Sequence, residues 1–402
     1  MEKKIVVKNL YKIFGQNPKL ALELLNKGLH KDEIFKNTGM VVGVQNANFH
    51  IDEGEIFVIM GLSGSGKSTL IRLLNRLIEP SYGHIFVDGK DVATMKRKQL
   101  IDLRRRDMSM VFQSFALLPH LSVIDNAAFG LAVAGVGKKE RHKRAMEVLE
   151  QVGLATFAKK YPSELSGGMQ QRVGLARALA VSPSLMLMDE AFSALDPLIR
   201  TEMQGVLLEL QKVEKRTVVF VSHDLEEAFR IGSRIAIMEG GRIVQVGTPE
   251  EIVRNPADEY VRTFFKGIDV DRYRTAKDMA KLDEILLINK PNDIVNGLRT
   301  AIHDLRQRHC NFGFVIGEDR NVVGAVSIDS MIQTLEHSNP SLETALLTDI
   351  QPVNQDTQMP ELVKSIVKNP CPLPVIDAES HYLGAITAGS LLRAKIKEAP
   401  HA

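Results

Sequence analysis

Residues 56–69 read IFVIMGLSGSGKST, and this stretch decides the fold of the first two thirds of the chain. The continuous apolar run over residues 56–60 predicts a strand buried on both faces, as in a parallel sheet. Gly61 to Ser68 match the pattern G-x-x-x-x-G-K-[ST], and a helical stretch follows through Leu77. A strand, a glycine-rich loop and a helix in this order are the context in which such loops bind phosphate. The stretch therefore predicts an α/β phosphate-binding unit.

The residue types in this loop suit a nucleoside triphosphate with Mg²⁺. Glycines let backbone N–H groups converge on phosphate oxygens, and the helix N-terminus adds a partial positive charge. Lys67 is expected to reach the β- and γ-phosphates, Ser68 to offer its hydroxyl to Mg²⁺, and Thr69 to help hold the phosphates. The residues expected around the phosphates are Gly61, Ser63, Gly64, Ser65, Gly66, Lys67, Ser68 and Thr69.

Two further apolar runs, residues 185–188 and 217–221, predict buried strands of the same sheet. Each run ends in polar residues, and the ligands of parallel α/β sheets gather at the carboxyl ends of the strands. After the first run, Asp189 is a candidate to hold Mg²⁺ through water, and Glu190 could accept a proton from an attacking water. Alone, this Asp-Glu pair could equally be a helix N-cap pair. The phosphate loop in the same chain favours the metal and base roles.

The segment LSGGMQQR over residues 165–172 resembles the LSGGQ signature of ABC-transporter ATP-binding subunits, with methionine at the last signature position. The resemblance extends over residues 1–265. It implies an α/β ABC-type P-loop ATPase domain, with ATP and Mg²⁺ as cofactors and a helical subdomain at about residues 100–180.

The resemblance also assigns roles to four residues outside the phosphate loop. Phe14 lies where the family stacks an aromatic ring on adenine. Gln113, in Val-Phe-Gln, matches the glutamine that meets Mg²⁺ and reports the γ-phosphate to the transmembrane partner. Asp196, in Ser-Ala-Leu-Asp, matches the D-loop, and His223, in Val-Ser-His-Asp, matches the switch histidine. Taken singly, Phe14 could be a core residue and His223 a buried structural histidine.

The family further implies a composite site between two copies of the chain. ATP on the loop of one copy would be closed by Ser166, Gly167 and Gly168 of the second, while Glu190 and His223 position the water and the γ-phosphate. Transmembrane permease subunits would supply the pathway, docking near residues 114–130, and would receive substrate from a periplasmic or extracellular binding protein. The expected location is the cytoplasmic face of the bacterial plasma membrane, as a peripheral subunit.

Longer stretches, among them MVFQSFALLPH and LMDEAFSALDPLIRTEMQ, are similar to the ATP-binding subunits of glycine betaine/L-proline importers. The segment at residues 16–41, which predicts two short helices, is similar as well. This resemblance implies import of betaine-type osmoprotectants. Importers of another small solute, a soluble ABC ATPase acting on nucleic acid or ribosomes, and a nucleotide-sensing regulator are the alternatives. The single phosphate loop argues against the soluble ATPase, and the full catalytic set argues against the regulator.

The last third of the chain carries an internal repeat with an offset of 60 residues. Val315–Ile316 recurs as Val375–Ile376, and Gly324–Ala325 as Gly384–Ala385. Such small units pack on each other because neither buries much surface alone. The tail resembles a pair of cystathionine-β-synthase (CBS) modules, which often bind adenine nucleotides. The predicted divisions are an ATPase domain at 1–268, a linker at 269–280, and modules at 281–340 and 341–398.

The two CBS-like copies lack a carboxylate that would grip a ribose. Ser327 and Thr387 occupy the first nucleotide-contacting position of the pattern, but Ser330 and Ser390 stand where an aspartate is usual. Nucleotide, ionic strength and lipid therefore all remain candidate cues for regulation.

The composition fits these expectations. The 402 residues carry 51 Lys+Arg and 49 Asp+Glu, so no overall charge favours nucleic acid. Two cysteines cannot staple a secreted scaffold, which favours a reducing compartment. No signal peptide and no apolar run long enough to cross a bilayer is evident.

Overall fold

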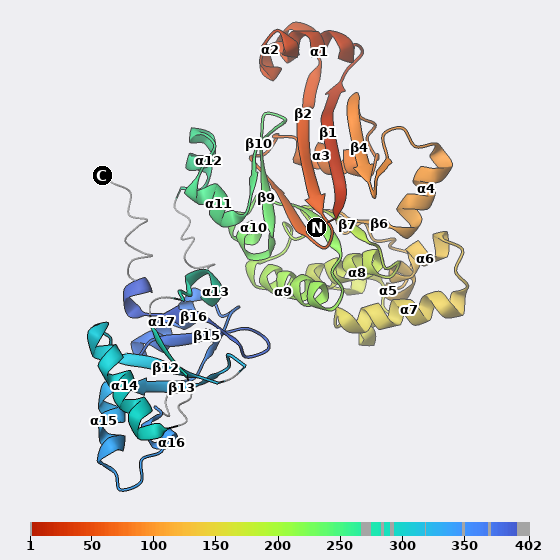
Figure 1. Ribbon diagram of the computed structural model, residues 1–402. Helices are drawn as coiled ribbons and strands as arrows, with labels where there is room; N and C mark the ends of the chain where they lie inside the picture. Colours follow the sequence, from red (N-terminus) through yellow and green to blue (C-terminus); the bar gives the residue numbers. More distant parts are fainter. Residues whose placement is uncertain are drawn as a thin grey trace. The chain divides into compact units, whose positions relative to one another are not determined.

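The computed structural model describes residues 2–266, 275–282, 285–289, 293–317, 319–347, 350–368 and 371–391. The chain forms two compact units, an N-terminal unit at Met1–Lys266 and a C-terminal unit at Gly267–Ala402 (Figure 1). Among the described residues, no helix is both long and apolar enough to cross a membrane.

A six-stranded sheet forms the centre of the N-terminal unit, with strand order β10-β9-β3-β8-β7-β6. Every pair is parallel except that of β10 with β9, which is antiparallel. The three strands predicted as buried runs lie side by side, and all their residues are buried. The strands are β3 (Ile56–Met60), β6 (Met108–Val111), β7 (Leu185–Asp189), β8 (Thr217–Val221), β9 (Arg234–Glu239) and β10 (Arg242–Gly247).

A second, four-stranded antiparallel sheet packs over helix α3 (Lys67–Leu74). Its order is β2 (Val41–Asp52), β1 (Lys3–Phe14), β4 (Tyr82–Val87) and β5 (Lys90–Asp91). Residues of both sheets and of α3 share one apolar cluster. Helix α3 ends three residues earlier than predicted, because Asn75 caps it and Arg76 takes a left-handed φ of 53°.

The helical subdomain is shorter than predicted at its start. Helix α4 (Arg97–Arg106) buries Leu100 and Leu103 in the main core and leads into β6, so residues from 100 to 111 belong to the sheet unit. The helical part begins after β6. It consists of α5 (Val123–Ala127), α6 (Phe129–Val133), α7 (Lys138–Gln151), two 3-10 turns (Ala155–Phe157 and Pro162–Glu164) and α8 (Gly167–Leu179).

The inserted segment forms two helices, α1 (Pro18–Asn26) and α2 (Lys31–Thr38), which cap the tip of β1 and β2 (Figure 1). Gly39 ends α2 with a left-handed φ of 67°, as its sequence position indicated. The remaining helices of this unit, α9 (Pro197–Val213), α10 (Leu225–Ile231), α11 (Pro249–Arg254) and α12 (Glu259–Phe264), follow β7 to β10.

The C-terminal unit contains two three-stranded sheets, β11-β12-β13 and β14-β15-β16. The repeat holds at the level of strand register. Val315 pairs with Gly324 and Val375 with Gly384, and an irregularity follows at the same place in both. The elements are β11 (Leu286–Asn289), α14 (Ile294–Gln307), β12 (Phe312–Ile316), β13 (Val322–Ser327), α15 (Ile328–Glu336), β14 (Val353–Asn354), α17 (Met359–Lys368), β15 (Leu373–Ile376) and β16 (Tyr382–Ile386).

Two short helices of this unit correct the predicted linker and the predicted module boundary. Helix α13 (Ala276–Met279) lies within the expected linker but packs in the core of the second module, beside Met359 and Leu362. Helix α16 (Leu342–Ala345) lies beyond the expected end of the first module but packs in its core. The core of each module therefore includes a short helix that lies outside the 60-residue repeat. For this reason the repeat alone does not predict where each module begins and ends. Residues 269–274 of the expected linker, and 392–398 of the second module, lie outside the described residues.

Candidate active site

The phosphate loop is built from close backbone contacts that only glycine permits. A Cβ at Gly61 would lie 2.1 Å from the Met238 carbonyl oxygen, and one at Gly66 would lie 2.2 Å from that of Gly43. Both glycines have positive φ, at 148° and 105°. The loop is thereby fixed between the end of β9 and β2, with its backbone at the N-terminus of α3.

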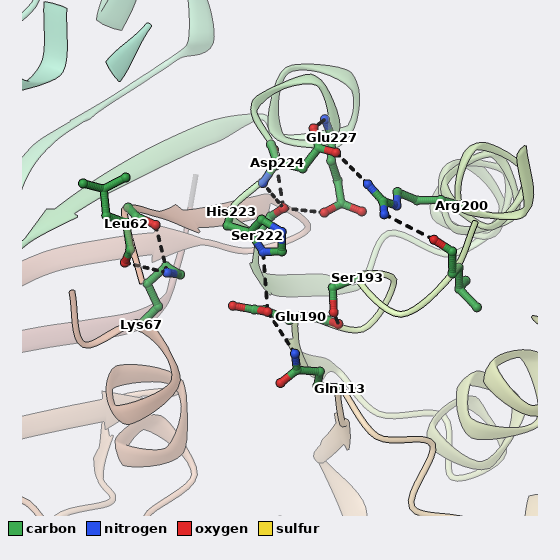
Figure 2. Close-up of polar contacts among 12 residues, drawn as sticks. Leu62, Lys67, Gln113, Glu190, Ser193, Arg200, Ser222, His223, Asp224 and Glu227 are labelled. Carbon is green, nitrogen blue, oxygen red and sulfur yellow. Dashed lines mark hydrogen bonds and ion pairs between the residues drawn. The ribbon is translucent and has the colours of Figure 1, made fainter. Parts of the chain in front are cut away.

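Lys67 folds back under the loop. Its Nζ donates to the carbonyl oxygens of Gly61 at 2.8 Å and Leu62 at 3.0 Å (Figure 2). Burial lowers the pKa of Lys67, and the nearby carboxylates Glu190 and Asp189 oppose that shift. Among the described residues, the hydrogen-bond partners of this ammonium are two neutral carbonyl oxygens, so an anionic phosphate would suit it better.

A cavity of about 480 Å³ opens above the loop, and most predicted nucleotide-binding residues line it. Phe14 is 39% exposed at its edge, with the Lys12 ammonium 4.9 Å from the ring centroid. Ser65 and Gly61 do not line the cavity; Ser65 is buried, and its hydroxyl has no hydrogen-bond partner among the described residues. The predicted residues on the cavity wall are Phe14, Ser63, Gly64, Gly66, Lys67, Ser68, Thr69 and Glu190.

Asp189 is held by an arginine that the sequence did not single out. Arg72, on α3, donates from Nη2 at 3.0 Å and from Nε at 3.2 Å to Asp189 Oδ2. The carboxylate is buried, and no described residue gives its other oxygen, Oδ1, a hydrogen-bond partner. A buried carboxylate oxygen that is free to accept a hydrogen bond fits a Mg²⁺ bound through water. Residue spacing gave no signal for Arg72, since the two partners are 117 positions apart.

Three predicted residues from three segments meet at one carboxylate (Figure 2). Gln113 Nε2 donates to Glu190 Oε2 at 3.2 Å, and His223 Nδ1 lies 3.5 Å from the same oxygen. Glu190 itself takes a left-handed φ of 47° directly after β7. The arrangement places a carboxylate that can accept a proton on the cavity wall, with an amide and an imidazole beside it.

Behind the histidine lies a polar network that sequence reasoning missed. Ser222 donates to the buried Glu227, which also accepts from Gln204 Nε2 at 3.2 Å. Arg200 donates to Asp224 Oδ2 at 2.7 Å and to the Leu195 carbonyl oxygen at 3.2 Å. Arg200 of α9 thus joins Asp224, which follows His223, to Leu195, which precedes Asp196. Figure 2 shows Arg200, Asp224, Ser222 and Glu227 of this network.

The signature residues do not lie on this chain's own cavity. Ser166 caps α8 by accepting from the Met169 N–H at 3.4 Å, and Gly167 and Gly168 form the first turn of that helix. A Cβ at Gly168 would lie 2.6 Å from Ile199 Cγ2. Asp196 caps α9, accepting from the Ile199 N–H at 3.1 Å. Their action on the nucleotide of a second copy stays a prediction.

This fold and site define a class of protein. A family model described as ABC transporter matches residues 44–193, and the chain belongs to the ABC-transporter ATP-binding proteins. It is therefore an ATP-binding protein and an ATPase.

Individual relatives are similar over nearly the whole chain. The glycine betaine/proline betaine transport system ATP-binding protein ProV of Salmonella typhimurium is 52% identical, covering 98% of both chains. The glycine betaine transport ATP-binding protein OpuAA of Bacillus subtilis is 44% identical, covering 97% of this chain and 92% of its own. Among solved structures, the dimeric ATP-binding cassette MJ0796 bound to ADP and Pi is 31% identical. It has a TM-score of 0.52 and covers 61% of this chain and 98% of its own.

Proposed function

We propose that this chain is the ATP-hydrolysing subunit of an importer for glycine betaine/proline betaine-type osmoprotectants. The convergence of Gln113 and His223 on Glu190, on the wall of the phosphate-loop cavity, carries the hydrolytic part of this proposal. The substrate class is supported by relatives whose names specify glycine betaine and which match 98% and 97% of the chain. Import of another small solute is the second candidate, because no residue of this subunit is expected to touch the transported molecule.

The chain's residues suggest a sequence of roles in hydrolysis. Lys67 would exchange its loop carbonyls for the β- and γ-phosphates, and Phe14 would stack on adenine. Mg²⁺ would neutralise phosphate charge when bound, held by Ser68 and Gln113 and, through water, by Asp189. Glu190 would take a proton from the attacking water, and His223 would stay beside the γ-phosphate.

A second copy of the chain would complete the site. Ser166, Gly167 and Gly168 of that copy would close over the ATP, and Asp196 would contact the opposite loop. The solved cassette that resembles the N-terminal unit is described as a dimer, which supports this arrangement. Hydrolysis would then reopen the pair and drive a separate permease, docked near residues 114–130 at the cytoplasmic face of the membrane. A periplasmic or extracellular binding protein would deliver the substrate to that permease.

The C-terminal unit is proposed to regulate the ATPase as a CBS pair. Its Ser330 and Ser390 hydroxyls both donate to backbone carbonyl oxygens of the same unit, on α16 for Ser330 and three residues earlier in the chain for Ser390. Ser330 Oγ donates to the Ala345 carbonyl oxygen at 2.8 Å, and Ser390 Oγ to that of Thr387 at 2.8 Å. These contacts favour a regulatory cue other than an adenine nucleotide.

Reconstitution in vesicles tests the proposal. The chain, its permease and its binding protein are assembled, and uptake of labelled glycine betaine, proline betaine and an unrelated amino acid is measured with and without internal ATP. We expect ATP-dependent uptake of the betaines. Uptake of glycine betaine without ATP dependence would contradict the energising role, and ATP-driven uptake of the amino acid alone would favour the second candidate.

A further inference from the structure

Helix α2 of the inserted segment forms a wall of the nucleotide cavity. Lys31, Asp32 and Phe35 line the same cavity as Phe14 and the phosphate loop. No sequence motif assigned these three residues a role. The cavity therefore has a second, helical side that the phosphate-loop pattern does not describe.

The orientation of α2 follows from its own core. Ile34 is fully buried in a cluster with Ile13, Ala21, Met40 and Val42, which fixes one face of the helix against β1, β2 and α1. Lys31 and Phe35 are four residues apart and therefore share another face, with Asp32 beside them. At the start of the helix, Glu33 Oε2 accepts from the His30 N–H at 2.9 Å.

A second contact relates α2 to the phosphate loop. The Lys31 side chain lies beside Gly240, with Cε 3.9 Å from the position of a Cβ there. Gly240 accepts from Gln45 Nε2 at 2.7 Å, and the Gly241 N–H donates to the Ser65 carbonyl oxygen at 2.9 Å. The β9–β10 turn thus contacts both the inserted helix and the loop.

Two aromatic rings consequently line one cavity. Phe14 comes from the end of β1 and is 39% exposed, and Phe35 comes from α2 and is 54% exposed. Aromatic side chains at the edge of a phosphate site offer flat apolar surfaces on which a nucleobase can stack.

We infer that α2 completes the base-binding part of the nucleotide site and that Phe35 makes a second aromatic contact to adenine, in addition to Phe14. This inference rests on the proposed binding of ATP at the phosphate loop. It gives the 16–41 segment a role in nucleotide recognition within its own subunit.

Equilibrium binding of two probes to the full chain tests the inference. ATP carries a base, and inorganic tripolyphosphate does not; both are titrated with Mg²⁺ present. The Phe35→Ala variant is expected to bind ATP about tenfold more weakly, the loss of one base–aromatic contact, and tripolyphosphate as the unchanged protein does. Phe35→Tyr should restore ATP binding, because the ring is kept.

Leu20→Ala is the matched control, since Leu20 is 40% exposed on α1 of the same insertion and does not line this cavity. It should leave both affinities unchanged. The inference is overturned if Phe35→Ala leaves ATP affinity unchanged, or weakens ATP and tripolyphosphate equally. If Lys67→Ala weakens ATP binding and Phe35→Ala does not, the inference alone fails. If the unchanged protein binds no ATP, the proposed function fails with it.

Discussion

Two glutamates near His223 have opposite surroundings. Glu190 lines the cavity and contacts Gln113 and His223, so it can meet water. Glu227 is 5% exposed and is enclosed by Ser222 and Gln204. The first is suited to proton transfer, and the second to fixing the segment that carries His223.

Glu227 gives a pH-dependent prediction. Burial raises the pKa of this carboxyl, so the folded protein binds its proton more readily than the unfolded chain does. Its contribution to stability is therefore largest below the ordinary glutamate pKa and falls as the pH rises through the raised one. Glu227→Gln removes the charge. Its amide oxygen can still accept from Gln204, and its NH2 can donate to the Ser222 hydroxyl oxygen, so the variant should remove this loss and be at least as stable at pH 8. Thermal unfolding of both proteins from pH 4 to 8 checks this; a variant less stable than the parent at pH 8 would contradict it.

Arg72 gives a prediction about the metal site. Arg72→Met removes both hydrogen bonds to Asp189 Oδ2 and leaves the carboxylate without a fixed orientation. We expect the Mg²⁺ concentration for half-maximal ATP turnover to rise about tenfold, as with other residues that hold a metal ligand in place. Arg105 is an exposed arginine on α4, and Arg105→Met is therefore the control. This variant should leave the Mg²⁺ dependence unchanged. If Arg72→Met leaves the Mg²⁺ dependence of ATP turnover unchanged, Arg72 does not position Asp189 for the metal.

The residues found by sequence are those whose role depends on local spacing. Lys67, Ser68 and Glu190 belong to short patterns next to apolar strands, and such patterns can be identified without a structure. Arg72, Arg200 and Glu227 act through partners that are distant in sequence or that lie on another helix, so no local pattern marks them.

At the scale of elements, the order of strands and helices could be predicted more fully than their boundaries. Apolar runs identified β3, β7 and β8, because strands buried on both faces are apolar throughout. The predicted start of the helical subdomain, at about residue 100, is too early. Helix α4 belongs to the sheet unit, because Leu100 and Leu103 on one of its faces pack in the main core. The placement of α13 in the core of the second module and of α16 in the core of the first depends on tertiary packing, which the 60-residue repeat does not encode.

The turn into α3 gives a prediction at this scale. Gly66→Ala would place a Cβ 2.2 Å from the Gly43 carbonyl oxygen at a positive φ, so the loop and the start of α3 must shift. We expect ATP affinity to fall at least tenfold, measured by equilibrium binding. Gly205→Ala, within α9 and with no neighbour within 4 Å, is the matched control. It should leave ATP binding intact and stabilise the protein by about 0.5–1 kcal/mol. Normal ATP binding by Gly66→Ala would contradict the proposed fit of the loop.

At the scale of the whole molecule, the two units have separate apolar cores. Calorimetry should therefore show two unfolding transitions. ATP with Mg²⁺ should raise the free energy of unfolding of the N-terminal unit alone. The increase should be about 2.7 kcal/mol when ATP is present at a hundred times its dissociation constant. An increase in the free energy of unfolding of the C-terminal unit as well would indicate that this unit binds nucleotide. It would contradict the proposal, based on Ser330 and Ser390, that the regulatory cue is not an adenine nucleotide.

The hydrolytic role of Glu190 is the central claim, and ATP turnover by Glu190→Gln tests it most directly. The amide keeps the size of the side chain but cannot accept the proton, so turnover should fall about 10²–10⁴-fold while ATP still binds. Leu20→Ala serves again as the control and should turn over ATP at the unchanged rate. Unimpaired turnover in Glu190→Gln would contradict the account.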